Sequence, residues 1–453
     1  MIPSEFISRL KEQLGDKKAG ELLSNLSDKG GASIRINPLK FNKPAPSGER
    51  VPWCPEGVYL EKRPLFTLDP HFHAGTYYVQ EASGMFLGEV VRQVRQGEQF
   101  LKVLDLCGAP GGKATHLSSL IGDNGLLVTN EVIRSRARIL SDNITRWGMG
   151  NVMVTNNDPG DFSEISGWFD MVVVDAPCSG EGMFRSSIAR REWSPANADL
   201  CSSRQRRILM NIWPALRNEG ILIYSTCTFN PEENEKNLAW LSGEENFESV
   251  KLDINGEWGI QEILHKGIYG YAFYPGRIKG DGFFISVMRK TGRREEKRLL
   301  RGNLPQGPTV SDSRVASEWS SFGEERIFVL RDKIVAGPAG NNMIYPVIDK
   351  LNIIKPGTII SVRKGADYLP DNELALSVRI NRDAFDAADL DYNEAIKYLR
   401  KDNIIISNRA TGWMLILFEG SILGLAKNLG NRLNNYYPTE WRIRMEAKQD
   451  EQH

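Results

Sequence analysis

Two cysteines, Cys178 and Cys227, each follow an apolar run with the length and composition of a β-strand. The run before Cys178 is Met171–Asp175, and the run before Cys227 is Gly220–Tyr224. Parallel strands bring their carboxyl ends to one edge of an open α/β sheet, which is where such sheets bind ligands. We therefore expect the two thiols at one ligand-binding edge, where one can act as a nucleophile and the other can assist it.

A glycine-rich loop, Asp105–Lys113, lies between a predicted strand and a predicted helix. Its glycines permit close backbone approach to a ligand, and the N–H groups at the helix start face that ligand. The glycines do not have the GxGxxG spacing of an NAD site. A phosphate-binding loop for ATP is also disfavoured, because Cys107 stands at the first glycine position and Ala114 at the Ser/Thr position.

S-adenosylmethionine fits this region better, because it has no phosphate but presents an amino acid end, a ribose diol and an adenine ring. Glu131 follows the second predicted strand, where a carboxylate can accept both ribose hydroxyls, and Asp158 follows the third, where it can accept from the adenine amino group. Asp175 ends the fourth strand, next to the transferable methyl. Each carboxylate alone could instead be a helix cap or a solvated loop residue. The predicted cofactor-binding residues are Cys107, Gly108, Ala109, Pro110, Gly111, Gly112, Lys113, Glu131, Asp158 and Asp175.

The segment Asp175–Cys178 has a thiol where amino-group methyltransferases have a tyrosine. Carbon 5 of a pyrimidine is a poor nucleophile, but a thiolate bonded to carbon 6 makes it enamine-like and able to accept a methyl group. A carboxylic acid at ring nitrogen 3 would stabilise the adduct, and Asp175 is placed for that task. Because a cysteine has an ordinary pKa of about 8.5, a nearby cation such as Lys113 would favour the thiolate. Either cysteine could alternatively be a small buried hydrophobe.

Three segments, in order, resemble the Sun/Fmu family of RNA cytosine-5 methyltransferases over about residues 30–290: Asp-Leu-Cys-Gly-Ala-Pro-Gly-Gly-Lys, Asp-Ala-Pro-Cys-Ser-Gly-Glu-Gly and Tyr-Ser-Thr-Cys-Thr-Phe-Asn-Pro-Glu-Glu-Asn-Glu. The resemblance implies that Cys227 is the nucleophile, that Cys178 assists product release, and that the loop and carboxylates named above bind S-adenosylmethionine. The tail, Gly424–Asn428 through Trp441–Arg444, is similar to the C-terminal, PUA-like RNA-binding module of bacterial RsmF-type ribosomal RNA methyltransferases. That similarity implies a cytosine in small-subunit (16S) ribosomal RNA as the target.

Alternating strands and helices from residue 100 to 290 predict an α/β fold with a doubly wound, Rossmann-like parallel sheet. We expect strands at Leu101–Leu106, Leu126–Asn130, Asn151–Thr155, Asp170–Asp175 and Gly220–Thr226, and helices at Gly112–Ile121, Ile133–Trp147 and Ser202–Leu216. A late strand at Phe283–Met288 is expected to run antiparallel and close the sheet. The predicted domains are a helical and α+β RNA-binding lobe (1–99), the methyltransferase domain (100–290), a linker (291–315) and a C-terminal mixed α/β RNA-binding module (316–453).

Composition is that of a soluble protein with an ample core, at 41% hydrophobic and 25% charged residues. No apolar run approaches the roughly 18–20 residues that cross a bilayer, and no leader is recognisable, so we predict a cytoplasmic protein without membrane contact, a monomer by default. The five cysteines form no CxxC pair and the five histidines are scattered, which predicts neither a disulfide framework nor a metal site.

The formal net charge is zero, so an RNA partner must be met by local patches. The predicted RNA-binding residues are Arg185, Arg190, Arg191, Arg204, Arg206 and Arg207, and a second basic stretch spans Arg289–Arg301. Either stretch could instead be a solvated helix face or a linker. Because A-form RNA hides carbon 5 in a deep groove, the target base must be unpaired or flipped, with Phe184 or Trp193 as candidate stacking partners.

Two other functions stay open at this level. An enzyme that methylates transfer RNA would share every core motif and differ only in its flanking modules. A ribosome-assembly or RNA-binding protein could keep the methyltransferase fold without turnover, although intact Lys113, Asp175 and both cysteines argue against it.

Overall fold

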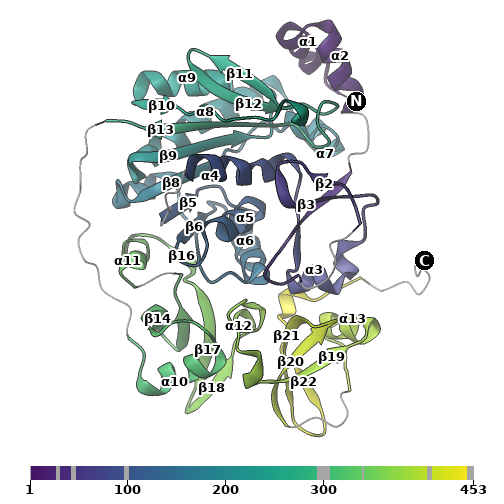
Figure 1. Cartoon of the computed structure of the whole chain (residues 1–453), viewed down its shortest axis with the longest axis vertical. Helices are drawn as coiled ribbons and strands as arrows, with labels where there is room; N and C mark the ends of the chain where they lie inside the picture. Colours follow the sequence, from purple (N-terminus) through teal and green to yellow (C-terminus); the bar gives the residue numbers. More distant parts are fainter. Residues whose placement is uncertain are drawn as a thin grey trace.

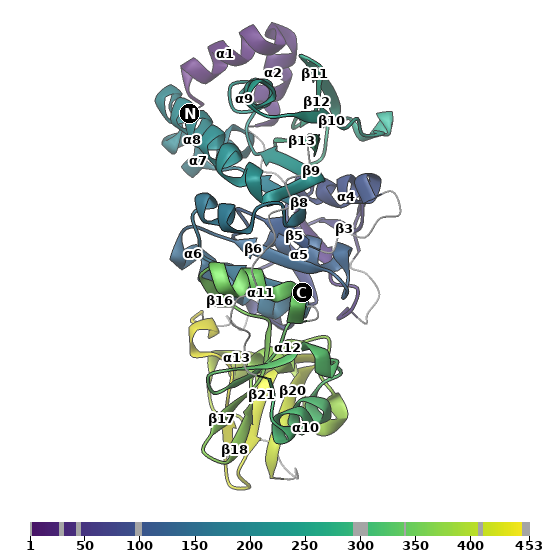
Figure 2. The same cartoon turned by 90° about the vertical axis from the view of Figure 1, so that its left-hand side faces the viewer.

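The computed structural model describes residues 2–26, 31–41, 47–95, 102–292, 307–338, 341–405 and 411–445. Its strands form one ten-stranded mixed sheet and three four-stranded sheets. Figure 1 shows the large sheet in the upper part of the molecule and the two C-terminal sheets side by side below it. The 90° turn in Figure 2 shows an elongated molecule with the helices α1 and α2 at one end and the C-terminal sheets at the other.

Five parallel strands make the middle of the large sheet, in the order β9-β8-β5-β6-β7. These strands are rich in Val, Leu and Ile because both of their faces are covered. Their bounds are Lys102–Asp105 (β5), Leu126–Asn130 (β6), Val152–Thr155 (β7), Phe169–Asp175 (β8) and Leu216–Thr226 (β9). The predicted doubly wound methyltransferase sheet is therefore confirmed.

Antiparallel strands extend the sheet beyond β9: β13 (Phe283–Lys290) pairs with β9, β12 (Ile268–Phe273) with β13, and β11 (Gln261–His265) with β12. Strand β10 (Phe247–Ser249) also pairs with β13. The late strand is antiparallel as predicted, but the expectation that it closes the sheet was wrong. The edge is β11, whose alternating half-buried and exposed residues carry a weaker apolar signal than β13.

Helices cover both faces of this sheet, and alternate residues of each strand point to opposite faces. Helices α4, α5 and α6 pack with Val103, Met171 and Val173, whereas α1, α2, α8 and α9 pack on the face that carries Leu104 and Val172. The bounds are Ser4–Leu14 (α1), Asp16–Asn25 (α2), Leu87–Arg95 (α4), Gly112–Ile121 (α5), Arg134–Trp147 (α6), Ser187–Glu192 (α7), Pro195–Ile212 (α8) and Glu235–Glu244 (α9).

The N-terminal region is divided between two cores. A four-stranded sheet in the order β2-β3-β1-β4 has its own small apolar cluster, but Phe6 and Leu10 of α1 belong to the core of the large sheet. The bounds are Ala32–Ile36 (β1), Arg50–Val51 (β2), Cys54–Leu60 (β3), Tyr77–Val79 (β4) and Pro70–Ala74 (α3). The predicted lobe 1–99 thus shares its first helices, and also α4, with the catalytic domain. Its predicted end lies outside the described residues, since residues 96–101 are not among them.

Phe184 and Trp193, the candidate stacking residues, are core side chains. Phe184 is fully buried and Trp193 is 8% exposed, and both rings pack against Phe6. They therefore cannot stack on an RNA base in this structure, because α1 covers them.

The C-terminal region contains two sheets and also contributes to the large one. Strand β16 (Ile353–Lys355) pairs with β7, so this region also contributes one strand to the catalytic sheet. Helix α10 (Val310–Trp319) starts within the predicted linker, because Thr309 and Asp312 cap each other's backbone. Linker residues 293–306, and with them most of the basic stretch, lie outside the described residues.

The remaining C-terminal elements follow the chain in two groups. The first group is β14 (Ile327–Leu330), β15 (Lys333–Ala336), α11 (Asn341–Lys350), β17 (Thr358–Lys364), β18 (Asp367–Pro370) and α12 (Asn372–Leu376). The second is β19 (Asp386–Leu390), α13 (Tyr392–Arg400), β20 (Gly412–Phe418), β21 (Ser421–Asn428) and β22 (Leu433–Asn435). Across the described ranges, no helix combines the length and apolarity that crossing a bilayer requires.

Candidate active site at the carboxyl edge of the large sheet

The two cysteine loops leave neighbouring parallel strands. Asp175 at the end of β8 lies opposite Ser225 in β9, and the cysteine that follows each strand turns toward the other. The Cys178 and Cys227 sulfurs are 3.0 Å apart, and the Cys227 backbone N–H donates to the Cys178 sulfur at 3.2 Å. Sheet geometry has therefore brought together the two thiols that the sequence placed at this edge.

The surroundings of Cys178 favour its protonated, neutral thiol form. Its hydrogen bond with Cys227 and its burial raise the pKa of the Cys178 thiol well above the usual range. At neutral pH it is therefore a neutral thiol that can donate a hydrogen bond to the Cys227 sulfur. A thiol that keeps its proton suits a helper role for Cys178 better than a nucleophilic one.

A charged pair lies beside the thiols. The Asp175 carboxylate accepts from Lys113 Nζ at 2.9 Å and from Ser225 Oγ at 2.7 Å. Burial alone would lower the pKa of Lys113, but the Asp175 carboxylate outweighs burial and the net pKa is raised. Lys113 also lies 5.1 Å from the centre of the Phe283 ring. The site therefore holds a fixed ammonium and carboxylate between the glycine-rich loop and the cysteine loops.

The glycine-rich loop packs closely against its neighbours, and two of its positions require glycine. Gly111 has a φ of +122° directly before α5, and a Cβ at Gly108 would lie 2.0 Å from Thr129 Oγ1. Asp105 is fully buried; its Oδ2 accepts from Thr129 Oγ1 at 3.2 Å, but its Oδ1 has no hydrogen-bond partner among the described residues. A buried carboxylate oxygen without a partner is costly, so it is suited to a ligand with a cationic or N–H group. Cys107, two residues along the chain, is half-buried, and the desolvation of its thiol raises its pKa well above the usual range.

The other two predicted cofactor carboxylates follow β6 and β7. Glu131 is almost fully buried; it accepts from the Ile133 backbone N–H at 2.9 Å and lies 3.1 Å from an Arg136 nitrogen. Asp158 accepts from the Gly160 N–H and caps the short helix η3 (Pro159–Ile165). The helix-cap alternative thus describes part of the role of Asp158. A carboxylate has about four acceptor sites, so both groups retain capacity for a ligand.

Comparisons with known proteins cover almost the whole chain. Residues 92–289 match the family of 16S rRNA methyltransferase RsmB/F, residues 2–82 the N-terminal domain of 16S rRNA methyltransferase RsmF, and residues 385–443 the methyltransferase RsmF PUA domain. Ribosomal RNA small subunit methyltransferase F of Escherichia coli O157:H7 is 30% identical over 97% of this chain and 96% of its own. The protein belongs to the RsmF family of 16S rRNA methyltransferases.

Further relatives agree with this assignment. Ribosomal RNA small subunit methyltransferase F of Enterobacter sp. (strain 638) is 28% identical over 97% of this chain and 95% of its own. A methyltransferase homologue from Pyrococcus horikoshii superposes with a TM-score of 0.54 at 28% identity, over 64% of this chain and 95% of that one. NSun6 from the same organism, at 20% identity and a TM-score of 0.53, shares the fold over 64% of this chain and 99% of that one.

S-adenosylmethionine is the cofactor of this methyltransferase family. The residues at the carboxyl edge fit it: the Asp105 oxygen without a partner among the described residues suits a cationic group, and Glu131 suits a diol. The loop from Cys107 to Lys113 would hold its amino acid end. The assignments of individual residues stay predictions.

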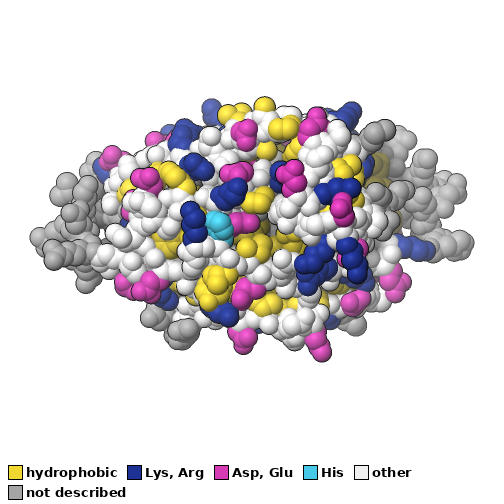
Figure 3. Space-filling model, turned by 90° about the horizontal axis from the view of Figure 1, so that it is seen from above, with side chains coloured by type: hydrophobic (Ala, Val, Ile, Leu, Met, Phe, Trp, Pro, Cys, Tyr) yellow, Lys and Arg dark blue, Asp and Glu magenta, His cyan; other side chains and the backbone are white. Residues whose placement is uncertain are grey.

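The predicted RNA-binding arginines fall into two groups. Arg185 pairs with Asp281 at 2.8 Å, and Arg206 donates to Asn237 Oδ1 at 2.8 Å, so both hold the fold together. Arg191, Arg204 and Arg207 are exposed, whereas Arg190 is half-buried. Arg207 also forms an exposed ion pair with Asp158 at 3.7 Å. Figure 3 shows acidic and basic side chains interspersed on the end of the molecule that α1 and α2 cover, with no large patch of one sign. The exposed arginines remain the candidates for phosphate contacts.

Sequence reasoning missed several polar residues of this region. Glu233 and Glu181 are fully buried beside the cysteine loops, and Asp105 is fully buried under the cofactor loop. All three lie within the family-like segments quoted above, and the available signal was their place in those segments. Arg9, which pairs with Glu181, carries no such signal because it lies in a distant amphipathic helix.

The structure also gathers three groups that could bind a metal: Cys54, Glu56 and His116, whose ligand atoms lie within 4.8 Å of one another. The sequence predicted no metal site. Arg35 interacts electrostatically with both Cys54 and His116, and its positive charge disfavours a cation there.

Proposed function

We propose that the protein methylates carbon 5 of a cytosine in small-subunit ribosomal RNA and that Cys227 is the nucleophile. The observation that carries the proposal is the 3.0 Å contact between two thiols beside a cofactor loop. Membership of the 16S rRNA methyltransferase RsmF family supports the RNA substrate, and the match at residues 385–443 to the RsmF PUA domain supports an RNA-binding surface.

In the proposed reaction, the Cys227 thiolate bonds to carbon 6 of the cytosine, and the displaced electron pair makes carbon 5 nucleophilic. The Lys113–Asp175 pair, with its 2.9 Å contact, can hold a proton at ring nitrogen 3 as charge develops there. When bound, S-adenosylmethionine supplies the methyl group that carbon 5 accepts.

Product release breaks the carbon 6–sulfur bond that the first step formed. A base removes the carbon 5 proton, the carbon 6–sulfur bond breaks, and its electron pair returns to the Cys227 sulfur. Cys178 keeps its proton at neutral pH because of its raised pKa, and its sulfur lies 3.0 Å from the leaving sulfur. A hydrogen bond from Cys178 therefore stabilises the leaving thiolate.

The test uses small-subunit RNA and a radiolabelled methyl donor. Cys227→Ala should lose methyl transfer, and RNA containing 5-fluorocytidine should become crosslinked to the wild-type protein at position 227. Cys54→Ala, which removes a buried thiol of the N-terminal sheet, should keep activity. Full activity of Cys227→Ala, or a crosslink at another residue, contradicts the proposal. A parallel assay on transfer RNA separates the two RNA classes.

Cys178→Ala tests the release step separately. It should still form the bond to carbon 6 but release the product slowly, so a covalent protein–RNA complex should accumulate with unmodified RNA. Equal amounts of complex in wild type and Cys178→Ala would remove the release role from Cys178.

A further inference from the structure

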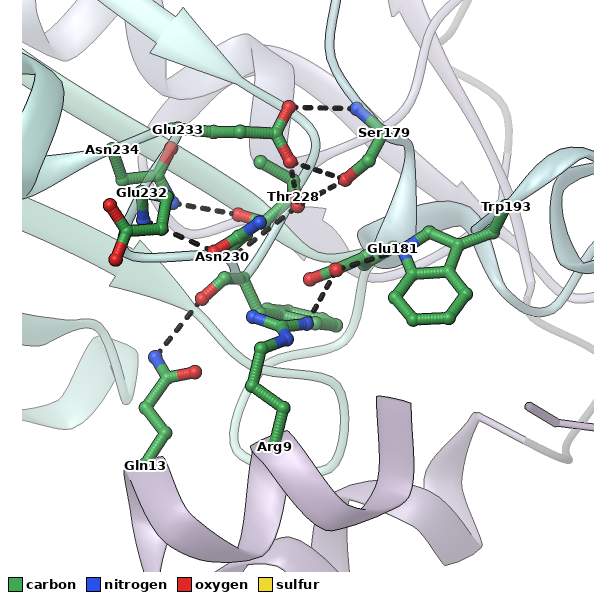
Figure 4. A network of polar contacts seen from close by, with 11 residues as sticks. Arg9, Gln13, Ser179, Glu181, Trp193, Thr228, Asn230, Glu232, Glu233 and Asn234 are labelled. Carbon is green, nitrogen blue, oxygen red and sulfur yellow. Dashed lines mark hydrogen bonds and ion pairs between the residues drawn. The ribbon is translucent and has the colours of Figure 1, made fainter. Parts of the chain in front are cut away.

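A buried network of polar groups lies behind the two cysteine loops (Figure 4). At its centre is Glu233, which is fully buried between the Cys178 loop and the Cys227 loop. A buried carboxylate is costly unless its oxygens accept several hydrogen bonds. The contacts of Glu233 therefore show what this residue stabilises.

Glu233 binds the residue that directly follows each cysteine. Its Oε2 accepts from the Ser179 backbone N–H at 2.9 Å, and its Oε1 accepts from Ser179 Oγ at 2.5 Å and from Thr228 Oγ1 at 3.3 Å. The Ser179 and Thr228 hydroxyl oxygens are 2.9 Å apart. One carboxylate therefore ties together two loops that are 49 residues apart in the chain.

Other contacts hold the same carboxylate and the same loops in place. Gln205 of α8 donates to Glu233 Oε2 at 3.0 Å and to the Pro177 carbonyl at 3.0 Å. The Gly182 N–H donates to the Cys227 carbonyl at 2.9 Å. Helix α8 thus also holds the Glu233 carboxylate, through a contact that does not involve the thiols.

Helix α1 holds the outer side of both loops. Arg9 forms an ion pair with the fully buried Glu181, three residues after Cys178, and Gln13 Nε2 donates to the Phe229 carbonyl at 3.0 Å, two residues after Cys227. Figure 4 shows both side chains reaching from α1 toward the loops. The two cysteine loops therefore lie between a carboxylate on one side and a helix on the other.

We infer that Glu233 is a positioning residue, whose buried carboxylate sets the separation of the Cys178 and Cys227 sulfurs by binding the residue after each cysteine. The inference deepens the proposed function, since it rests on the pairing of these two thiols in the reaction. It does not require that Glu233 touch RNA or cofactor. A displacement of about 1 Å can cost a hundred-fold in rate, so the separation matters for release by Cys178.

A disulfide-forming assay measures the separation without methylation. Diamide oxidises two neighbouring thiols to a disulfide and accepts their two electrons and two protons. Peptide mass spectrometry then follows the Cys178–Cys227 crosslink over time. Glu233→Ala should slow this crosslink by at least about ten-fold, because its loops lose their shared acceptor.

Glu233→Gln is the rescue variant. Its amide oxygen can still accept from the Ser179 and Gln205 N–H groups, and its NH2 group can donate to the Ser179 hydroxyl. Its crosslinking rate should stay within about three-fold of wild type. Asn151→Ala, which loses two buried hydrogen bonds to the Ser118 and Gly122 carbonyls far from the thiols, is the control for destabilisation and should crosslink normally.

Methylation kinetics provide the second measurement. Glu233→Ala should lower kcat and accumulate the covalent RNA complex while KM for RNA stays unchanged, whereas general destabilisation would lower active enzyme without accumulating the complex. If Glu233→Ala does not fold, Thr228→Val is the second variant. It keeps the shape of the side chain but removes the hydroxyl, with its contacts to Glu233, Ser179 and the Asn230 N–H, and it should slow the crosslink by about three-fold. The inference is overturned if a folded Glu233→Ala forms the disulfide at the wild-type rate. If Glu233→Ala does not fold, the same result for Thr228→Val overturns it. A different outcome would refute the proposed function alone: the wild type does not methylate the RNA, but Glu233→Ala still forms the disulfide more slowly than the wild type.

Discussion

The cofactor half and the thiol half of the site are built differently. On the cofactor side, Glu131 binds Ile133 and Asp158 binds Gly160, so each carboxylate is oriented by residues two positions along the chain. On the thiol side, the cysteine loops are held by Glu233 and by Arg9, the latter 172 residues away from its partner. The comparison teaches that Glu131 and Asp158 are oriented in part by their own loops, whereas the thiol contact depends on distant elements that must already be packed.

Lys113 joins the two halves, and its removal should have the largest effect. Its ammonium sits on the cofactor loop and contacts Asp175, which precedes the Cys178 loop. Lys113→Met should reduce turnover by about a hundred-fold to a thousand-fold, since a preorganised charge in an active site contributes that much. Single-turnover methylation measures it. A change smaller than about ten-fold would show that the two halves work without this charge.

Helix α1 should matter for the thiol half alone. Arg9→Met leaves the buried Glu181 with Trp193 as its remaining side-chain donor among the described residues, which should lower the free energy of unfolding by about 2–3 kcal/mol. Denaturant titration measures the loss, and cofactor affinity at low temperature should stay unchanged.

The matched control for α1 is Lys11→Met, which removes a solvent-exposed contact between Lys11 of α1 and Asp16, the first residue of α2. Exposed ion pairs contribute little, so its stability should equal that of wild type. Equal stability of both variants would show that α1 does not hold the loops.

The cofactor half should show its own pH dependence. Burial, and secondly Asp175, raise the pKa of Asp105 to about 7. Between the ordinary aspartate pKa of about 3.9 and that value, the folded protein keeps a proton that the unfolded chain has lost, so stability falls as pH rises. Asp105→Asn cannot ionise, and its stability relative to wild type should increase by roughly 2 kcal/mol from pH 5 to pH 7. Unfolding titrations at both pH values check the sign, and a constant difference contradicts it.

The smallest expected effect comes from a Glu131 variant, which should change the cofactor half of the site and leave the thiol half unchanged. Glu131→Gln keeps an acceptor for the Ile133 N–H but loses one carboxylate oxygen, so we expect about ten-fold weaker binding of S-adenosylmethionine by calorimetry. The rate of the Cys178–Cys227 disulfide reaction should not change. A slower disulfide reaction in this variant would mean that the cofactor half also positions the thiols.

Strands that are apolar on both sides were the easiest part of the fold to predict. The run Met171–Asp175 and helix α5 at Gly112–Ile121 lie where the sequence placed them, because burial on both faces and a glycine before the helix leave strong local signals. Strand β11 and the start of α10 were not predicted, because half-exposed strands and short capped helices leave only weak local signals in the sequence. The domain boundaries at residues 99 and 315 stay a prediction. Helices α1 and α4 pack in the cores of the large sheet, and β16 pairs with β7, so the contacts of the catalytic domain extend beyond both boundaries.

By itself, the sequence determined that two thiols, a glycine-rich loop and three carboxylates follow the parallel strands, because those positions depend on strand order and spacing. Only the tertiary structure decided which arginines are paired, that Phe184 and Trp193 are core, and that Glu233 holds both cysteine loops. The physical reason is that burial and hydrogen bonding between distant segments are properties of packed elements, and no local pattern records them.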